Sequence, residues 1–252
     1  MHRLIISAPF GNYVQPRGMT PTLGTFTLEP RPGRVWRILR TVRYYPRAGA
    51  WINQIGLRNP GLGWLAQRAA DQRIDLTDKI VSIHGFSDDQ WYRLLDQSAA
   101  LSPMAVELNM SCPNVGAIEW PADLFTRATG QLQQVIVKLP PVNYHLLVEQ
   151  AVEQGVRSFH CCNTLPTPRG GISGKPLKPV ALQCVRDLRE RFPTLQLTLI
   201  GGGGITSPQD IDDFAEAGAD HFAVGTKVMN PVYLFTHRGL APLRERVAAL
   251  TS

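Results

Sequence analysis

The sequence lacks any long apolar run. No stretch of its 252 residues approaches the roughly 20 apolar residues that a membrane-spanning helix needs. The first residues, MHRLIISAP, lack the apolar core and cleavage site of a signal peptide. Cysteines are few, four in all, and none has the CxxC spacing of a metal site, so we expect free thiols and no bound metal. These absences predict a cytoplasmic protein.

Charge of one sign is not gathered into a dense run either. The 26 Lys and Arg outnumber the 20 Asp and Glu, which gives a net charge of +6, but the basic residues are scattered along the chain. We therefore expect no nucleic-acid partner, and a mildly basic field also suits small anionic ligands. Hydrophobic residues make up 44% of the chain, as in an ordinary folded protein. With no linker, internal repeat or low-complexity run, we predict one domain over residues 1–252.

Eight short apolar runs have the length and composition of strands. Continuous apolar strands that alternate with helical patterns indicate an α/β protein with a parallel sheet, and eight such units predict a closed (β/α)8 TIM barrel. The eight runs lie near Leu4–Ser7, Thr22–Thr27, Lys79–Ile83, Met104–Asn109, Gln134–Lys138, Arg157–Cys161, Gln196–Ile200 and His221–Val224. Three helices with clear start signals should run from Ser87 to Ala100, from Asn143 to Gly155 and from Ser207 to Gly218.

Two segments depart from the regular alternation. Residues 11–21, between the first two strands, are too few and too rich in Gly and Pro for a full helix, which predicts a pruned first crossover. Residues 29–78, between the second and third strands, should form an excursion that folds over one end of the barrel. We expect its aromatic residues to form a small core beneath it, with a subunit contact as the alternative. These residues are Trp36, Tyr44, Tyr45 and Trp51.

The segment VELNMSCPNV, residues 106–115, is the strongest candidate for a reaction centre. In a barrel of this kind ligands bind at the carboxyl ends of the strands, and this segment runs from a predicted strand into a loop. Asn109 and Asn114 supply carboxamides, which match the donor and acceptor edges of a flat heterocycle. Cys112 between them supplies a thiol that can take a proton once ionised. The alternative is that Cys112 is an inert buried thiol.

Glycines at the ends of the last two strands suggest a phosphate cradle. Gly201–Gly204 follow the seventh strand and Gly225-Thr226 the eighth, where barrels of this kind bind phosphate. Glycines let backbone N–H groups approach an anion closely, although a tight turn would explain the first loop alone. Lys138 ends the apolar run VIVKLPP, and a buried lysine needs an anionic or strongly accepting partner. The alternative is a lysine that faces solvent.

These segments resemble those of the dihydroorotate dehydrogenases, over nearly the whole chain and in order. The matching segments are VELNMSCPNV, VIVKLPP, Asn163-Thr164, GGISGKPL (170–177), IGGGGI (200–205), VGT (224–226), LGTFTLEPRPG (23–33) and INQIGLRNPG (52–61). The resemblance implies an FMN-dependent barrel that oxidises dihydroorotate to orotate in pyrimidine biosynthesis. It also implies that Cys112 removes the C5 proton while a hydride passes from C6 to flavin N5.

The resemblance assigns residues to two binding sites. It implies that the pyrimidine is held by Asn53, Asn109, Asn114, Asn163 and Thr164. It implies that FMN is held by Ala8, Thr25, Asn109, Lys138, Gly174, Gly203, Gly204, Gly225 and Thr226. Lys138 would stabilise negative charge near flavin N1 and O2. Cys112 is typical of the soluble branch of the family, whereas LGTFTLEPRPG resembles the membrane-associated branch, so the chain mixes features of both.

One departure from the family concerns charge. The family places a lysine against flavin and substrate, and the two places where it occurs read Asn12 and Gly24 here. Arg17, Arg31 and Arg34 are candidates to replace that cation. The absence keeps two alternatives open: an FMN oxidoreductase acting on another dihydropyrimidine or an enone, and a flavin-binding barrel without catalysis.

We expect the electron acceptor to be a soluble oxidant or a partner subunit rather than a membrane quinone. The first strand begins at about Leu4, which leaves no room for the N-terminal extension of the membrane-associated branch. A homodimer is also compatible with the sequence.

Overall fold

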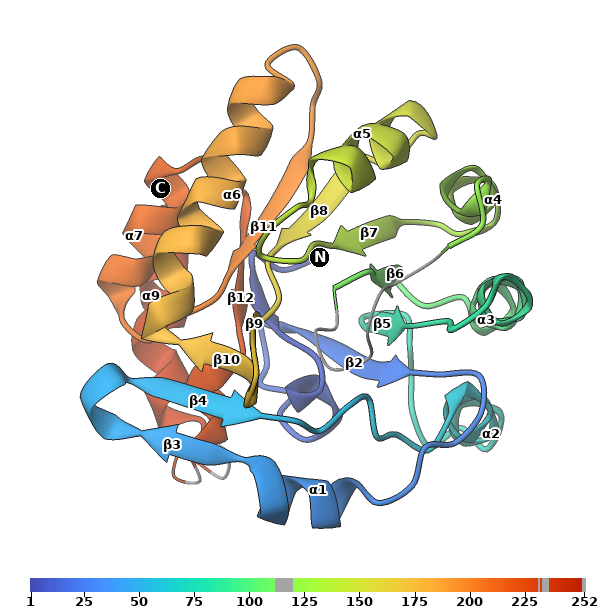
Figure 1. The fold of residues 1–252 in the computed structure, drawn as a ribbon, viewed down its shortest axis with the longest axis horizontal. Coiled ribbons are helices and arrows are strands. Elements are labelled where there is room, and N and C mark those ends of the chain that lie inside the picture. Colours follow the sequence, from blue (N-terminus) through green and yellow to red (C-terminus); the bar gives the residue numbers. More distant parts are fainter. Residues whose placement is uncertain (112–119, 231, 233–235, 251–252) are drawn as a thin grey trace.

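The computed structural model describes residues 1–111, 120–230, 232 and 236–250, and in this part of the chain eight parallel strands close into a barrel (Figure 1). Each strand pairs with the next along the chain, and the last pairs with the first. The eight expected strands are therefore confirmed, in the arrangement of a TIM barrel. They are β1 (Leu4–Ile6), β2 (Thr20–Phe26), β5 (Ile80–Ile83), β6 (Ala105–Asn109), β7 (Val135–Lys138), β8 (Ser158–Cys161), β11 (Thr198–Gly202) and β12 (His221–Val224).

Both faces of the barrel strands are buried, which explains why their sequences read as continuous apolar runs. Alternate residues of a strand point to opposite faces. One set forms a small apolar layer inside the barrel, to which Ala105 on β6 and Ile136 on β7 belong. Glu107 and Asn109 follow Ala105 at steps of two, and Lys138 follows Ile136 in the same way. The strand pattern therefore places a carboxylate, a carboxamide and an ammonium on the inner face, toward one end of the barrel.

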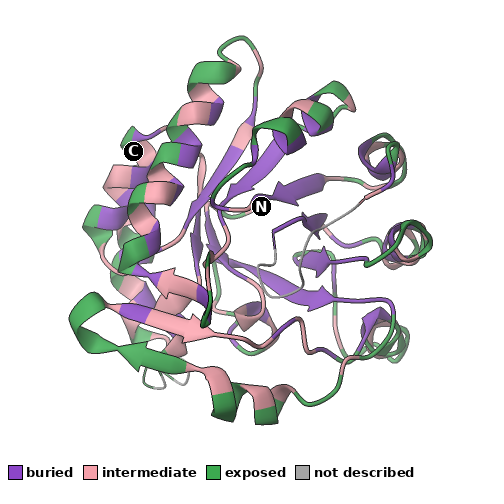
Figure 2. Cartoon of the chain, in the orientation of Figure 1, coloured by how far each residue is buried: buried purple, intermediate pink, exposed green. Residues whose placement is uncertain are grey.

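Helices cover the outside of the barrel and bury one face against it (Figures 1 and 2). They are α2 (Leu62–Ala70), α3 (Asp88–Leu101), α4 (Leu124–Gln131), α5 (His145–Glu153), α6 (Lys178–Arg191), α7 (Pro208–Glu216) and α9 (Ala241–Ala249). The start signals at Ser87 and Ser207 are confirmed, since each serine caps the helix that follows it. The start predicted at Asn143 is wrong by two residues. Asn143 has a φ of 57°, a left-handed conformation that asparagine tolerates but a helix excludes.

The first crossover contains only a single 3-10 turn among its elements, η1 (Phe10–Asn12), as the breaker-rich sequence predicts. The longer excursion contains α1 (Arg34–Thr41), β3 (Arg43–Tyr45), η2 (Pro46–Ala48) and β4 (Ala50–Asn53). Strand β4 pairs with β10 (Gly170–Gly174), which pairs in turn with β9 (Leu165–Thr167). The result is a second, antiparallel sheet in the order β3-β4-β10-β9, which lies beside the barrel end (Figure 1). The chain continues through η3 (Lys175–Leu177), η4 (Thr226–Met229) and η5 (Arg238–Leu240).

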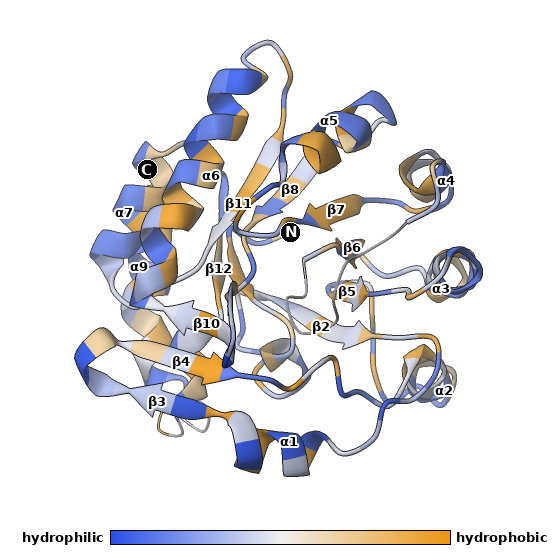
Figure 3. Cartoon of the chain, in the orientation of Figure 1, coloured by the Kyte–Doolittle hydropathy of each residue, from blue (hydrophilic) through white to orange (hydrophobic). Residues whose placement is uncertain are grey.

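The small aromatic core expected beneath the excursion is not formed. Trp36 is 62% exposed and Tyr44 is 50% exposed, and α1 buries none of its residues. Tyr44 contacts Trp51, with ring centroids 4.7 Å apart, but the rest of the aromatic set faces outward. The outer surface of α1 and β3 is accordingly mostly exposed in Figure 2, and Figure 3 shows hydrophilic and hydrophobic positions interleaved there. A subunit contact at this surface stays a prediction.

Three of the four cysteines lie in described parts of the chain, and all three are buried free thiols: Cys161, Cys162 and Cys184. Burial raises the pKa of Cys162 well above its ordinary value. The pKa of Cys184 is raised by its hydrogen bond with Cys161 and by burial. Cys161 ends β8 and Cys162 follows it, so both thiols pack at a strand end. Of the helices described, none combines the length and apolar character needed to cross a bilayer.

Candidate functional site

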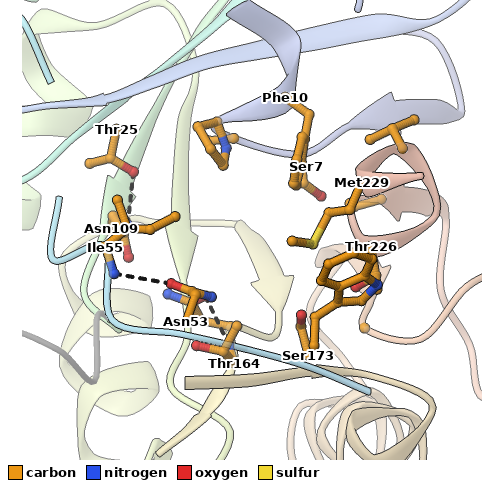
Figure 4. Close-up of a pocket in the computed structure, with 18 of the residues that line it drawn as sticks. Ser7, Phe10, Thr25, Asn53, Ile55, Asn109, Thr164, Ser173, Thr226 and Met229 are labelled. Atoms are coloured by element: carbon orange, nitrogen blue, oxygen red, sulfur yellow. Dashed lines mark hydrogen bonds between the residues drawn. The ribbon is translucent and has the colours of Figure 1, made fainter. Parts of the chain in front are cut away.

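A cavity of about 490 Å³ opens at the carboxyl ends of the barrel strands (Figure 4). Most of the residues that the sequence singles out line it. They are Ala8, Thr25, Asn53, Asn109, Lys138, Asn163, Thr164, Gly203, Gly204, Gly225 and Thr226. Gly174 does not line the cavity, although its neighbour Ser173 does. Cys112 and Asn114 lie outside the described residues, so their roles stay predictions.

The carboxamides of Asn109 and Asn163 are held in place by their own chain. Asn109 Nδ2 donates to Thr25 Oγ1 at 2.9 Å, as Figure 4 shows, and Asn109 Oδ1 accepts from Ser111 Oγ at 2.8 Å. Asn163 Nδ2 donates to the backbone oxygen of Ser111 at 3.0 Å. Ser111 thus links the amide at the end of β6 with the amide that follows β8. Their fixed orientation suits recognition of a ring whose edge alternates donors and acceptors.

A buried charge cluster lies on the inner face of the barrel. Lys138 is 5% exposed, which excludes the alternative of a lysine facing solvent, and its Nζ lies 3.9 Å from Glu107 Oε1. His160 Nδ1 lies 2.7 Å from Glu107 Oε2, and it donates to that oxygen because an ionised carboxylate only accepts. Lys138 and His160 also line the cavity, whereas Glu107 does not. The Glu107 carboxylate therefore fixes Lys138 and His160 at the cavity wall without lining the cavity itself.

The pKa values of this cluster define its charges. Burial pushes the pKa of Glu107 upward, but the Lys138 ammonium and the His160 hydrogen bond outweigh it and bring the pKa to about 2. Burial, reinforced by Lys138, lowers the pKa of His160, so its imidazole is neutral near pH 7. The cluster thus holds one positive charge and one negative charge, with the positive one at the cavity wall.

The two residues after β11 must be glycines, because their backbone conformation and their close neighbours leave no room for a side chain. Gly203 and Gly204 have φ values of 120° and 85°, in the left-handed region. A Cβ on Gly203 would lie 2.9 Å from the Leu177 side chain, and one on Gly204 would lie 2.9 Å from the Gly174 oxygen. The loop is a tight turn, but it also lines the cavity beside Gly225 and Thr226. This chain therefore retains a glycine-lined cradle in which backbone groups can approach a phosphate.

Replacing Gly204 with valine should abolish retention of a phosphate-bearing ligand. The added side chain meets Gly174 and Lys178 and strains a backbone with positive φ. We expect Gly204→Val to purify without FMN and to fail to take it up, as measured by flavin absorbance after gel filtration. Gly63→Ala is the control, because nothing lies within 4 Å of a Cβ there. A Gly204→Val protein that keeps one equivalent of FMN would contradict the assignment of the cradle.

Sequence reasoning missed several residues that line the cavity. Trp51, Arg58 and Ser173 come from the excursion and the second sheet, while His160 comes from β8. The available signal for His160 was its place opposite Lys138 in a parallel pair, which puts both on the inner face. No local pattern marks the others, since their position depends on pairing between distant strands.

An eight-stranded parallel barrel defines a class of protein whose ligands bind at the carboxyl ends of the strands. The family model for dihydroorotate dehydrogenase matches residues 18–238. The chain therefore belongs to the dihydroorotate dehydrogenase family, a family of oxidoreductases whose members typically bind FMN.

Individual relatives agree with this assignment. The chain is 34% identical to the dihydroorotate dehydrogenase B (NAD(+)) catalytic subunit of Latilactobacillus sakei subsp. sakei, over 79% of this chain and 72% of the relative. It is 29% identical to dihydroorotate dehydrogenase A (fumarate) of Limosilactobacillus reuteri, over 75% and 73% respectively. A crystal structure of a ligand-free dihydroorotate dehydrogenase from Eimeria tenella has the same fold. It superposes with a TM-score of 0.73 at 19% identity, covering 91% of this chain and 77% of that one.

Proposed function

We propose that this protein is an FMN-dependent enzyme that oxidises dihydroorotate to orotate. The observation that carries the proposal is the convergence on one cavity of three groups: the fixed carboxamides, the buried Lys138 and the glycine cradle. They come from the ends of β6, β7, β8, β11 and β12, and together they offer a site for a planar ring, a redox cofactor and a phosphate. Family membership supports the same reaction class, oxidation of a CH–CH bond.

The described residues fit FMN. Gly203, Gly204 and Gly225 leave room at the cavity wall for a phosphate, with Thr226 as a hydroxyl donor. Lys138 Nζ, fixed by Glu107, would face the N1 and O2 edge of the ring system, where negative charge gathers on reduction. When bound, the flavin supplies the acceptor for the hydride that leaves the substrate.

The remaining chemistry belongs to the chain itself. We propose that Asn53, Asn109 and Asn163, with Thr164, orient the pyrimidine ring, and that Asn114 completes this set. Cys112 takes the proton from C5 of the substrate. Cys112 follows the end of β6 by three residues in the sequence, which would bring the base to the strand end that carries Asn109. The acceptor that reoxidises the flavin is proposed to be a soluble oxidant or a partner subunit, in keeping with relatives named for NAD(+) and for fumarate.

A second candidate function rests on the missing lysine. Neither Asn12 nor Gly24 can supply a cation, so an uncharged dihydropyrimidine or an enone would meet no unpaired charge at those two places. This alternative keeps the fold, the flavin and the carboxamides, and changes only the substrate.

An anaerobic titration tests the proposed function. The purified protein should be yellow, and addition of dihydroorotate should bleach its flavin absorbance with a stoichiometry of one. Bleaching by an uncharged dihydropyrimidine or an enone, with dihydroorotate inert, would replace the first function with the second. A flavin that none of these compounds reduces would leave only the flavin-binding barrel without catalysis.

A further inference from the structure

The two places where the family carries its lysine are structurally closed to a cation. Asn12 Nδ2 donates to the oxygens of Pro9 at 2.8 Å and Gly24 at 3.2 Å, so its side chain is engaged with the backbone. Gly24 has a φ of 100°, and a Cβ there would lie 2.4 Å from the Ser82 oxygen. A lysine at this position would therefore require the backbone to move. Any cation that meets the substrate must come from elsewhere.

The cavity has two cations that are not neutralised. Among the described lining residues the cationic side chains are Lys138, Arg34 and Arg58, and no Asp or Glu is present. Lys138 is paired with Glu107. In the described part of the chain neither arginine makes an ion pair, and the Nε atoms of both are buried without a hydrogen-bond partner. Unsatisfied guanidinium donors at a cavity wall favour an anionic ligand.

Each arginine has one contact that positions its guanidinium group, with the first crossover for Arg34 and within the excursion for Arg58. Arg34 is the first residue of α1, and its guanidinium lies over the Tyr13 ring, 5.2 Å from the ring centroid. Arg58 Nη1 donates to the Pro32 oxygen at 3.2 Å. Residues 30–70 contain eight arginines and no acidic residue, so this part of the excursion offers the guanidinium groups no counter-charge. Arginine also offers a planar fork of donors that matches a carboxylate.

We propose that Arg34 and Arg58 form an anion subsite that receives the carboxylate of a planar ring substrate, replacing the lysine of the family. The inference rests on the proposed function and sharpens it, because it assigns specificity for a charged ring to the excursion rather than to the barrel strands. Arg17 and Arg31, the other candidates named from the sequence, do not line the cavity.

Ligand pairs that differ in one carboxylate test the subsite by binding alone. Isothermal titration calorimetry compares orotate with uracil, and cinnamate with cinnamamide, on the purified FMN-loaded protein. The parent should prefer the carboxylate member of at least one pair. Arg34→Gln and Arg58→Gln should each weaken binding of the carboxylate by about tenfold to a hundredfold, which is the cost of losing a hydrogen bond to a charged group. Binding of the uncharged ligand of the pair should not change. Arg34→Lys should recover part of the loss.

Arg47→Gln is the matched control, since Arg47 belongs to the same excursion but is exposed and does not line the cavity. Equal losses in Arg47→Gln and Arg34→Gln would overturn the subsite and leave only a general basic field. No carboxylate preference in either pair would also overturn it. A parent that prefers cinnamate but does not bind orotate would uphold the subsite and refute the proposed dihydroorotate activity. Calorimetry on flavin-free protein keeps the subsite test separate if FMN does not bind.

Discussion

Cys112→Ala is expected to slow reduction of the bound flavin by dihydroorotate by about 10²–10⁴-fold, the usual effect of removing a general base. FMN should remain bound, because the glycine cradle and Lys138 belong to other strand ends. The rate is measured by anaerobic stopped-flow absorbance. Cys112→Ser should retain some activity that rises with pH, since a hydroxyl is a poorer base than a thiolate near neutrality.

Cys184→Ala provides the control for this experiment. It removes a buried thiol that does not line the cavity, and it should reduce flavin at the rate of the parent. If Cys112→Ala reacts as fast as Cys184→Ala, the cysteine is structural and the base is another group.

Glu107→Gln is expected to destabilise the protein by about 3 kcal/mol near neutral pH. The folded pKa of Glu107, about 2, lies below its ordinary value of 4.5. Each unit of that difference corresponds to about 1.4 kcal/mol. A depressed carboxyl pKa contributes stability that is fully present above about pH 4.5 and is lost as pH falls toward 2. The variant also leaves Lys138 buried beside a neutral amide, which is costly in itself.

Urea unfolding of the protein between pH 3 and pH 7 measures this effect. The parent should lose stability steeply below about pH 4.5, and Glu107→Gln should start lower and show a flatter curve over that range. Glu153→Gln, on the exposed surface of α5, should follow the parent. Parallel curves for the parent and Glu107→Gln would show that Glu107 does not carry the stabilising charge.

The sequence predicts the barrel well because its signal is local. Each barrel strand is buried on both faces, so each appears as a short apolar run, and Ser87 and Ser207 mark helix starts through their own side chains. The second sheet escapes prediction for the opposite reason. Strands β4 and β10 pair although more than a hundred residues separate them in the sequence, and the glycine-rich segment 170–174 has no local pattern that predicts this pairing. The aromatic core of the excursion was predicted wrongly, because hydrophobicity alone does not say which side of a helix or strand has a partner.

The same difference between local and long-range signals separates the site residues that the sequence predicts from those that it does not. Residues at the ends of barrel strands, such as Asn109 and Lys138, could be assigned because a parallel barrel brings all strand ends to one rim. Glu107 was overlooked, although a step of two from Asn109 puts it on the same inner face. Arg58 could not be placed, because its position depends on how the excursion folds back over the rim.

The burial of three thiols gives the folded protein a chemical selectivity. Alkylating reagents attack the thiolate. Cys161 and Cys184 are enclosed in the core, and Cys162 lines the cavity but is only 5% exposed. Cys162 and Cys184 also have raised pKa values. A reagent such as iodoacetamide should therefore react slowly with these three thiols while the fold is intact. Rapid labelling of the native chain is therefore expected at the remaining cysteine, Cys112. Mass spectrometry can then distinguish label on Cys112 from label on the three buried thiols, and loss of the Cys112 label on addition of a ligand can be followed without any engineered tag.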